Sequence, residues 1–380
     1  MDTALSAAVR RFPLLGRPRP ACPALPEWLR EIADIAAAAR RQGVNGIADA
    51  AHALNKAALL ASDCGLTDLA NDLCWQHIDI YRAADRKLTS LEARYMLEPV
   101  LNLARLQIRA DAGEQALQLL TATYRAVTTS TDLVVNGHTL PLANPTGTQQ
   151  EQGKLREWVW LQYLADGIRA LALAGRWDEA VEHAKAHSGI GLHLMEGRQA
   201  AIIASCLQGA LSTARAMVKE STLTQPWEQQ VAHCLNVMCA DPDKKSVGRD
   251  VAAMVAHFRR HEPMPGYAVF RARLGLTVVT LASATDPGTA ARVLTQVAGE
   301  AIDAGDGYAA RDVLGFHGAI ADVTEPQRRA LSGLVTDSGL GSRTLLEPLL
   351  KSFVASVEMA KEALAASTTR HSTGTLLRWS

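Results

Sequence analysis

The feature that most constrains the fold is the regular interruption of apolar helical patterns by glycine. After residue 27, runs with apolar residues three and four positions apart follow one another, and short polar turns separate them. Glycine suits these turns because it adopts the left-handed backbone conformation that closes a helix. The glycines that end such runs are Gly43, Gly65, Gly113, Gly175, Gly209 and Gly305. The pattern predicts an all-α fold in which successive helices are antiparallel neighbours.

The spacing predicts helices throughout the chain after the first 26 residues. The expected ranges are 27–42, 44–63, 66–83, 90–111, 114–129, 153–173, 177–187, 192–207, 210–220, 226–240, 247–261, 266–283, 287–303, 306–321, 325–336 and 343–366. Between two of them, Asn136-Gly137 lies among β-favouring residues, which predicts a short β-hairpin in an insertion at 131–150. The insertion is either a lid or docking hairpin, or a passive loop.

The turns share a further pattern, in which alanine follows the glycine by five residues. In the segment 174–180, Ala-Gly-Arg-Trp-Asp-Glu-Ala resembles the inter-helix turn of tetratricopeptide repeats. Gly175 and Gly209 are 34 residues apart, which is the period of that family, and Ala214 and Pro226 match its alanine and closing proline. The resemblance covers about 45–320. It implies a right-handed α-α solenoid, here 27–366, whose first helices line a peptide-binding groove.

Polar stripes recur on the helices that this resemblance would place in the groove. Asn45, Asp49, His52 and Lys56 are four, three and four residues apart, a spacing that puts them on one helix face between wholly apolar stripes. Similar stripes follow on three later helices. They comprise Glu98, Asn102, Arg105 and Arg109; Gln162, Asp166 and Arg169; and Gln229, His233 and Asn236.

These stripes give the candidate partner-binding residues. They are Asn45, Asp49, His52, Lys56, Asn102, Arg105, Arg109, Gln162, Asp166, Arg169, His233 and Asn236. Amide and guanidinium groups have fixed donor geometry that suits a peptide backbone or carboxylate. The competing interpretation is that each stripe is only the solvated side of an amphipathic helix. The expected function is a non-enzymatic adaptor, such as an accessory or regulatory subunit, that holds a peptide or partner protein. Monomer and homodimer both remain open as its oligomeric state.

An enzyme is the alternative, with a pocket that the polar helix faces form and the hairpin at 131–150 covers. Asp49 and His52 would then be the first acid–base candidates, because side chains three apart on a helix can touch. The familiar nucleotide, hydrolase and metalloprotease motifs are absent from the sequence. We therefore expect no cofactor and no metal. The pairs His183/His187 and His257/His261 have metal-ligand spacing but lack a carboxylate in register.

Composition narrows the partner classes. The formal net charge is +0, with 39 basic and 39 acidic residues, so the basic field on which nucleic-acid binding depends is missing. No apolar run is long enough to cross a membrane. The six cysteines form no C-x-x-C pair and are expected to be reduced, in a cytoplasmic protein. A high content of alanine and arginine suggests a high-GC bacterial gene. Proline and arginine at 1–26 predict a flexible arm, and 367–380 a flexible tail.

Overall fold

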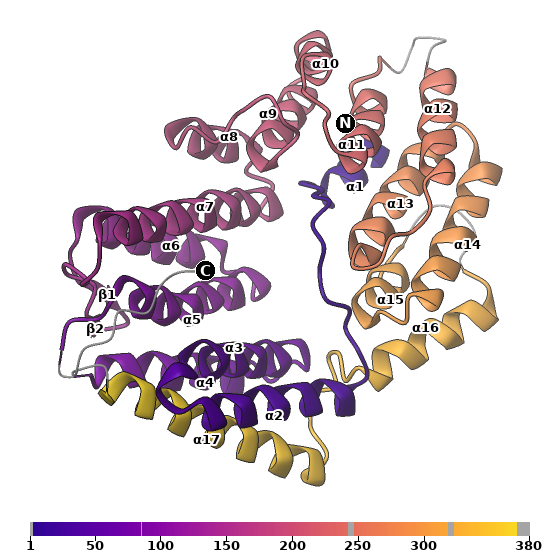
Figure 1. Ribbon diagram of the computed structural model, residues 1–380. Coiled ribbons are helices and arrows are strands. Elements are labelled where there is room, and N and C mark those ends of the chain that lie inside the picture. The colour runs from indigo at the N-terminus through magenta and orange to yellow at the C-terminus, as the bar shows by residue number, and fades with distance from the viewer. Residues whose placement is uncertain (1–2, 85, 242–246, 318–322, 371–380) are drawn as a thin grey trace. The chain divides into compact units, whose positions relative to one another are not determined.

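The computed structural model describes residues 3–84, 86–241, 247–317 and 323–370, and nearly all of its regular structure is helical. The chain divides into two compact units (Figure 1). Unit 1 comprises residues 1–24 and 167–338, and unit 2 comprises 25–166 and 339–380. Both units are discontinuous in sequence, whereas the sequence predicts one array over 27–366.

Unit 2 contains the first helices after the N-terminal segment and the last helix of the chain. Its elements are α2 (Leu25–Gln42), the 3₁₀ turn η1 (Gly43–Asn45), α3 (Ile47–Asp63), α4 (Thr67–Arg82), α5 (Ser90–Arg109), α6 (Gly113–Thr129), β1 (Leu133–Val135), β2 (His138–Leu140) and α17 (Glu347–Arg370). Helix α7 (Gln149–Leu173) belongs to unit 2 up to Asp166 and to unit 1 from Gly167.

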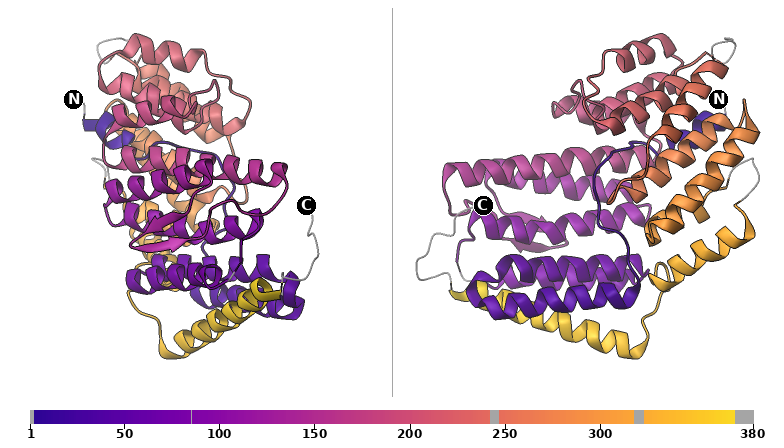
Figure 2. Two further views of the ribbon diagram at one scale, coloured as in Figure 1. Left: turned by 90° about the vertical axis from the view of Figure 1, so that its left-hand side faces the viewer. Right: turned by 45° about the vertical axis from the view of Figure 1, so that its right-hand side comes forward.

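Apolar stripes on the first helices form the core of unit 2. On α3, Ile47, Ala51, Leu54 and Ala58 are all buried, as their spacing predicts. Each helix from α3 to α6 contacts the next one, and α3 also contacts α5. Helix α17 packs along α2 and α3, so the end of the described chain completes the core that the residues after 25 begin (Figures 1 and 2).

The predicted β-hairpin is confirmed. Strands β1 and β2 pair antiparallel, with Val135 opposite His138 and Leu133 opposite Leu140. The two loop residues, Asn136 and Gly137, have φ values of 48° and 79°, as in a type I′ turn. These conformations are strained for most residues but accessible to Asn and Gly, which is why this dipeptide marks hairpins in sequence.

Unit 1 is entirely helical in its described regular structure. Its helices are α1 (Thr3–Val9), α8 (Trp177–Ala186), α9 (Glu196–Leu207), α10 (Leu211–Lys219), α11 (Pro226–Met238), α12 (Val247–Arg260), α13 (Ala268–Ala282), α14 (Pro287–Asp303), α15 (Gly307–Leu314) and α16 (Glu325–Asp337). Helix α13 is buried almost all round, which suits its nearly uninterrupted apolar sequence.

The segment before α2 is packed rather than a flexible arm. Phe12 and Leu14 are buried, and the side-chain amide of Gln199 pairs with both the N–H and the C=O of Leu14, at 2.8 and 2.7 Å. The arginines of the segment are also engaged, since Arg17 forms an ion pair with Glu196 at 2.8 Å. The high proline and arginine content predicted a flexible arm, because it did not reveal the buried apolar residues that lie between the polar ones.

Several helix ends differ from the expected ranges. Asn45 lies in η1, so the first member of its stripe is not on α3. At the junction between η1 and α3, a Cβ at Gly46 would lie 2.2 Å from the Ala39 carbonyl oxygen, so only glycine fits this close approach of the backbone. The expected helix 192–207 begins at Glu196, and 306–321 ends at Leu314, with 318–322 outside the described residues.

The end of the chain differs in the same way. Helix α17 continues to Arg370 with Ser367 and Thr368 buried, while the remainder of the expected tail, 371–380, lies outside the described residues. The predicted helix 287–303 coincides with α14. The all-α class with a small hairpin is confirmed. Within the described residues, no helix combines the length and apolar character needed to cross a bilayer.

Candidate functional site

A continuous set of hydrogen-bonded polar side chains joins α3, α5 and α7 within unit 2. Asn55 on α3 donates to Glu98 on α5 at 2.7 Å and accepts from Asn102 at 3.2 Å. Arg105, one turn further along α5, continues the set to α7. We call these residues the polar ladder: Asn55, Glu98, Asn102, Arg105, Gln162 and Asp166.

Arg105 is the branch point of the polar ladder. Its Nε donates to Asp166 at 3.0 Å, its Nη2 to Gln162 at 2.9 Å and its Nη1 to Asn102 at 3.3 Å. The Asp166 side chain is 10% exposed and the Arg105 side chain 39%. The guanidinium thus fixes a nearly buried carboxylate on one side and faces solvent on the other.

Helix α5 can present this face because its start and its buried face are well defined. Thr89 caps the helix, and the Thr89 and Glu92 side chains form a reciprocal capping box. Leu97, Val100, Leu101 and Ala104 are buried. The polar positions between these buried residues lie on one face of the helix and supply the α5 side chains of the polar ladder.

Arg109 extends the polar face by one more turn. It forms an ion pair with Asp63 at 3.1 Å and also donates to Ser62, both at the C-terminal end of α3. The Asp63 side chain is only 2% exposed, whereas that of Arg109 is 40% exposed. Sequence analysis missed Asp63 and Asn55, because both lie beside rather than within the stripe on α3.

The stripe on α3 is engaged mainly with α2. Asp49 accepts a hydrogen bond from Gln42 at 2.7 Å, and Lys56 forms a 2.7 Å ion pair with Glu31. Partial burial, followed by the positive charge of Lys56, lowers the pKa of His52. Among the described contacts, none is a hydrogen bond between Asp49 and His52, although the negative charge of Asp49 opposes the lowering of the His52 pKa.

The remaining predicted residues belong to unit 1, which is described by itself. Arg169 lies on the unit 1 part of α7. His233 and Asn236 lie on α11, where both are half-buried. The His233 ring packs against His257 of α12 with ring centroids 4.5 Å apart and planes tilted by 36°, and His257 packs against His261 with centroids 4.4 Å apart and planes tilted by 44°. The structure therefore brings together Asn102, Arg105, Gln162 and Asp166, and places these last residues elsewhere.

Arg105 and the neighbouring Arg94 balance the negative charge of the polar ladder. Burial raises the pKa of Glu98, although Arg94, the hydrogen bond from Asn55 and Arg105 all oppose that rise. Arg94 lies 3.7 Å from the Glu98 carboxylate and stacks over Trp158. The acidic groups of the polar ladder are thus neutralised locally, while the guanidinium groups of Arg105 and Arg109 stay partly exposed.

A cavity of about 630 Å³ lies elsewhere in unit 2, between α4 and α17. Asp79, Ile80, Arg86, Lys361 and Thr368 are among the residues that line it. None of the residues predicted from the stripes lines this cavity. It was beyond sequence reasoning, because its walls come from opposite ends of the sequence.

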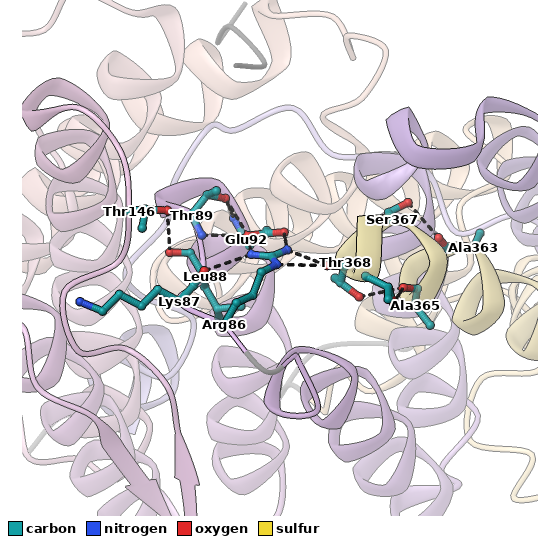
Figure 3. A network of polar contacts seen from close by, with 11 residues as sticks. Arg86, Lys87, Leu88, Thr89, Glu92, Thr146, Ala363, Ala365, Ser367 and Thr368 are labelled. Atoms are coloured by element: carbon teal, nitrogen blue, oxygen red, sulfur yellow. Dashed lines mark hydrogen bonds and ion pairs between the residues drawn. The ribbon is translucent and has the colours of Figure 1, made fainter. Parts of the chain in front are cut away.

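One wall of this cavity contains a dense network of polar contacts, which Figure 3 shows. Arg86 donates to both carboxylate oxygens of Glu92, at 2.5 and 2.9 Å, and to the Thr368 carbonyl oxygen at 2.8 Å. Burial alone would raise the pKa of Glu92, but hydrogen bonds from Arg86 and Thr89 outweigh it and lower that pKa. The guanidinium is fully engaged in joining the start of α5 to the end of α17.

The hairpin insertion borders a small cavity. A cavity of about 30 Å³ lies between α6, the loop after the hairpin and the start of α7, with Val127, Leu142 and Leu155 in its walls. That volume suits about one water molecule, and neither Asp49 nor His52 lines it. Across the described ranges, no three His, Cys, Asp or Glu side chains are placed to hold a metal ion.

Comparison with known proteins gives no relative: no family model matches the chain, and neither the curated proteins nor the solved structures contain a match.

Proposed function

We propose that the protein is a non-enzymatic binding protein that holds a peptide or a segment of a partner protein against α3, α5 and α7 of unit 2. In this proposal the helices form a right-handed solenoid of tetratricopeptide type, whose first helices line the binding face. The observation that carries it is the position of Arg105, which side-chain partners hold in place while 39% of it stays exposed.

The exposed edge of Arg105 suits a carboxylate or a peptide carbonyl. A guanidinium has five N–H groups, and the polar ladder accounts for three hydrogen bonds. Because Asp166 and Gln162 already fix its plane, binding would cost little side-chain entropy. Arg109, similarly anchored by Asp63, would supply a second charged contact one turn away.

A partner search with matched variants tests the proposal. The wild-type chain, Arg105→Ala/Arg109→Ala and the control Arg125→Ala/Arg329→Ala would be used as bait in extracts of the native host. Each charge-assisted hydrogen bond is worth about 1.5–3 kcal/mol, so loss of either arginine weakens binding roughly tenfold or more. Partners should be lost from the first variant and kept by the control.

Circular dichroism would confirm that both variants remain folded. Arg109→Lys keeps the charge but not the planar donors, and should bind at intermediate strength. A partner set that Arg105→Ala/Arg109→Ala shares with the wild type would show that the polar face is not the binding site.

A further inference from the structure

Two buried cysteines of unit 1 are nearly in bonding contact. Cys206 lies in the last turn of α9, and Cys239 caps the C-terminus of α11. Their sulfur atoms are 3.2 Å apart. A disulfide requires a separation of about 2 Å, so a shift of about 1 Å would join them. The sequence gives no sign of this pair, because 32 residues separate its members.

We propose that Cys206 and Cys239 form a reversible disulfide when the protein meets a hydroperoxide. Cys206 is the sulfur that reacts first, and Cys239 is the one that resolves the intermediate. The bond would link the C-terminal ends of α9 and α11 and enclose α10 in a closed loop. This site is separate from the polar ladder and does not depend on the proposed function.

The surroundings of the pair support that division of roles. The hydrogen bond from Cys239 lowers the pKa of Cys206, and the same contact raises the pKa of Cys239. Arg215 on α10 donates to the Cys239 carbonyl oxygen at 3.4 Å, so a cation lies beside the pair. A thiolate with a donor and a nearby cation is the form that reacts with peroxides.

Three of the other buried thiols differ in this respect. Burial raises the pKa of Cys64 to about 11 and the pKa values of Cys74 and Cys234 to about 12. Those three sulfurs therefore stay protonated and unreactive near neutral pH. Cys234 lies on α11, the helix that Cys239 caps, so it serves as an internal control.

The chemistry balances with a hydroperoxide as oxidant. The Cys206 thiolate attacks the outer peroxide oxygen; the O–O bond breaks, Cys206 becomes a sulfenic acid, and the leaving oxygen takes up the proton that Cys206 had released. The Cys239 sulfur then attacks the Cys206 sulfur; the S–S bond forms, the S–O bond breaks, and the hydroxide leaves with the Cys239 proton as water. Two thiols lose two electrons, and the peroxide gains them.

Access requires only a local opening. Both side chains are buried, at 4% and 1% exposure, but they lie at helix ends covered by the nine-residue α10. Short helices and helix ends open far more often than the whole fold. Hydrogen peroxide is small enough to reach sulfur through such an opening.

The test treats the reduced full-length chain with hydrogen peroxide, blocks the remaining thiols after denaturation, and measures intact mass and peptide maps. We expect four of the six cysteines to be blocked and a Cys206–Cys239 cross-link that dithiothreitol removes. Cys234→Ser should form the same cross-link, whereas Cys206→Ser and Cys239→Ser should not.

A sulfenic acid trap then checks the order of the steps. In Cys239→Ser, a 1,3-diketone probe should label Cys206; in Cys206→Ser, Cys239 should remain unlabelled. Wild-type protein that keeps six free thiols, or cross-links through other cysteines, would overturn the proposal. Because these outcomes are read from the wild type, they hold even if a variant folds poorly.

Discussion

The polar ladder of unit 2 and the imidazole stack of unit 1 (His233, His257 and His261) arise from similar sequence stripes but differ in structure. In the polar ladder, amide, guanidinium and carboxylate groups on neighbouring helices satisfy one another. In the imidazole stack, rings from α11 and α12 pack at 4.4–4.5 Å, and the Nε2 atom of His257 is buried without a partner among the described residues.

The contrast shows what helical spacing determines. It places residues on one face, but the neighbouring helix decides whether that face becomes a hydrogen-bonded set or a packed one. Hydrogen bonds between guanidinium and carboxylate groups are directional, so each group fixes the orientation of the other. Neutral rings that pack together are stabilised mainly by van der Waals contact. The polar ladder should therefore stabilise the fold through directional hydrogen bonds and ion pairs, whereas the stabilisation that the imidazole stack provides should change mainly with pH.

The largest effect is expected where a nearly buried carboxylate of unit 2 loses the arginine with which it forms an ion pair. Arg86→Ala would leave Glu92, whose side chain is 2% exposed, without its ion pair. Removing one member of a buried pair costs about 4 kcal/mol, and urea unfolding would measure the loss. Arg82→Ala, which breaks an ion pair with a half-exposed Asp79, should change the unfolding free energy by less than about 1 kcal/mol. Equal effects of the two would show that burial of the partner is irrelevant.

At low pH, a buried histidine of unit 2 should cost the protein more stability than its counterpart in unit 1. Burial lowers the pKa of His77 in unit 2 to about 3, and both its ring nitrogens lack partners within the described structure. The folded state therefore favours the neutral ring. The free energy of unfolding is at its full value above the unfolded-state histidine pKa of about 6.5, and roughly 3 kcal/mol of it is lost as the pH falls to 4. His77→Phe should remove that loss, as measured by urea midpoints from pH 7 to pH 4.

His257→Phe provides the matched variant in unit 1. Burial, then the charges of neighbouring groups including His233 and His261, lower the pKa of His257 to about 4. As for His77, the folded state favours the neutral ring, so the stability linked to His257 is lost as the pH falls from about 6.5 to 4. The loss should be smaller than for His77, because the His257 ring is only half-buried. A wild-type pH slope that survives in His77→Phe would assign the acid sensitivity to other groups.

Direct comparison of the polar ladder with the imidazole stack should give an intermediate effect. Arg105→Ala leaves Asp166 nearly buried and unpaired, at a cost of about 2 kcal/mol. His233→Phe keeps a ring of similar size against His257 and should change stability by less than about 1 kcal/mol. Chemical denaturation of both variants at pH 7 measures the difference. The comparison fails if His233→Phe is the more damaging.

The smallest effect concerns the hairpin. Gly137→Ala places a side chain at φ 79°, and should cost roughly 1 kcal/mol although the space around it is open. Gly153→Ala on α7 also meets open space, but without positive φ. Since alanine favours helix, that control should stabilise the protein by a few tenths to about 1 kcal/mol. Thermal melts would rank the two, and a stabilising Gly137→Ala would contradict the type I′ turn.

Local structure was predictable because it depends on nearby residues. Asn136-Gly137 specified the hairpin, and apolar spacing located most helices within a few residues. The stripe on α5 correctly grouped Asn102 and Arg105. Asn55, which pairs with Asn102, and Asp63, which pairs with Arg109, were missed, because the relative rotation of α3 and α5 depends on contacts between segments far apart in the sequence.

Long-range associations account for the other differences. Residues 3–24 pack with unit 1 through Phe12 and Leu14, although their composition is typical of an extended linker. Likewise, the closeness of Cys206 and Cys239 depends on how α9 and α11 pack. No local pattern records which distant helix will cover a given apolar or thiol side chain.

The discontinuity of unit 2 has a consequence for biosynthesis. Helices α2 and α3 leave the ribosome well before their apolar neighbour α17, because most of the described helices lie between them in the sequence. Until then, a face of the nascent chain that later becomes core stays open to water, which favours aggregation or chaperone capture. Translation that stops before residue 347 would release a chain whose first-made helices never acquire their cover.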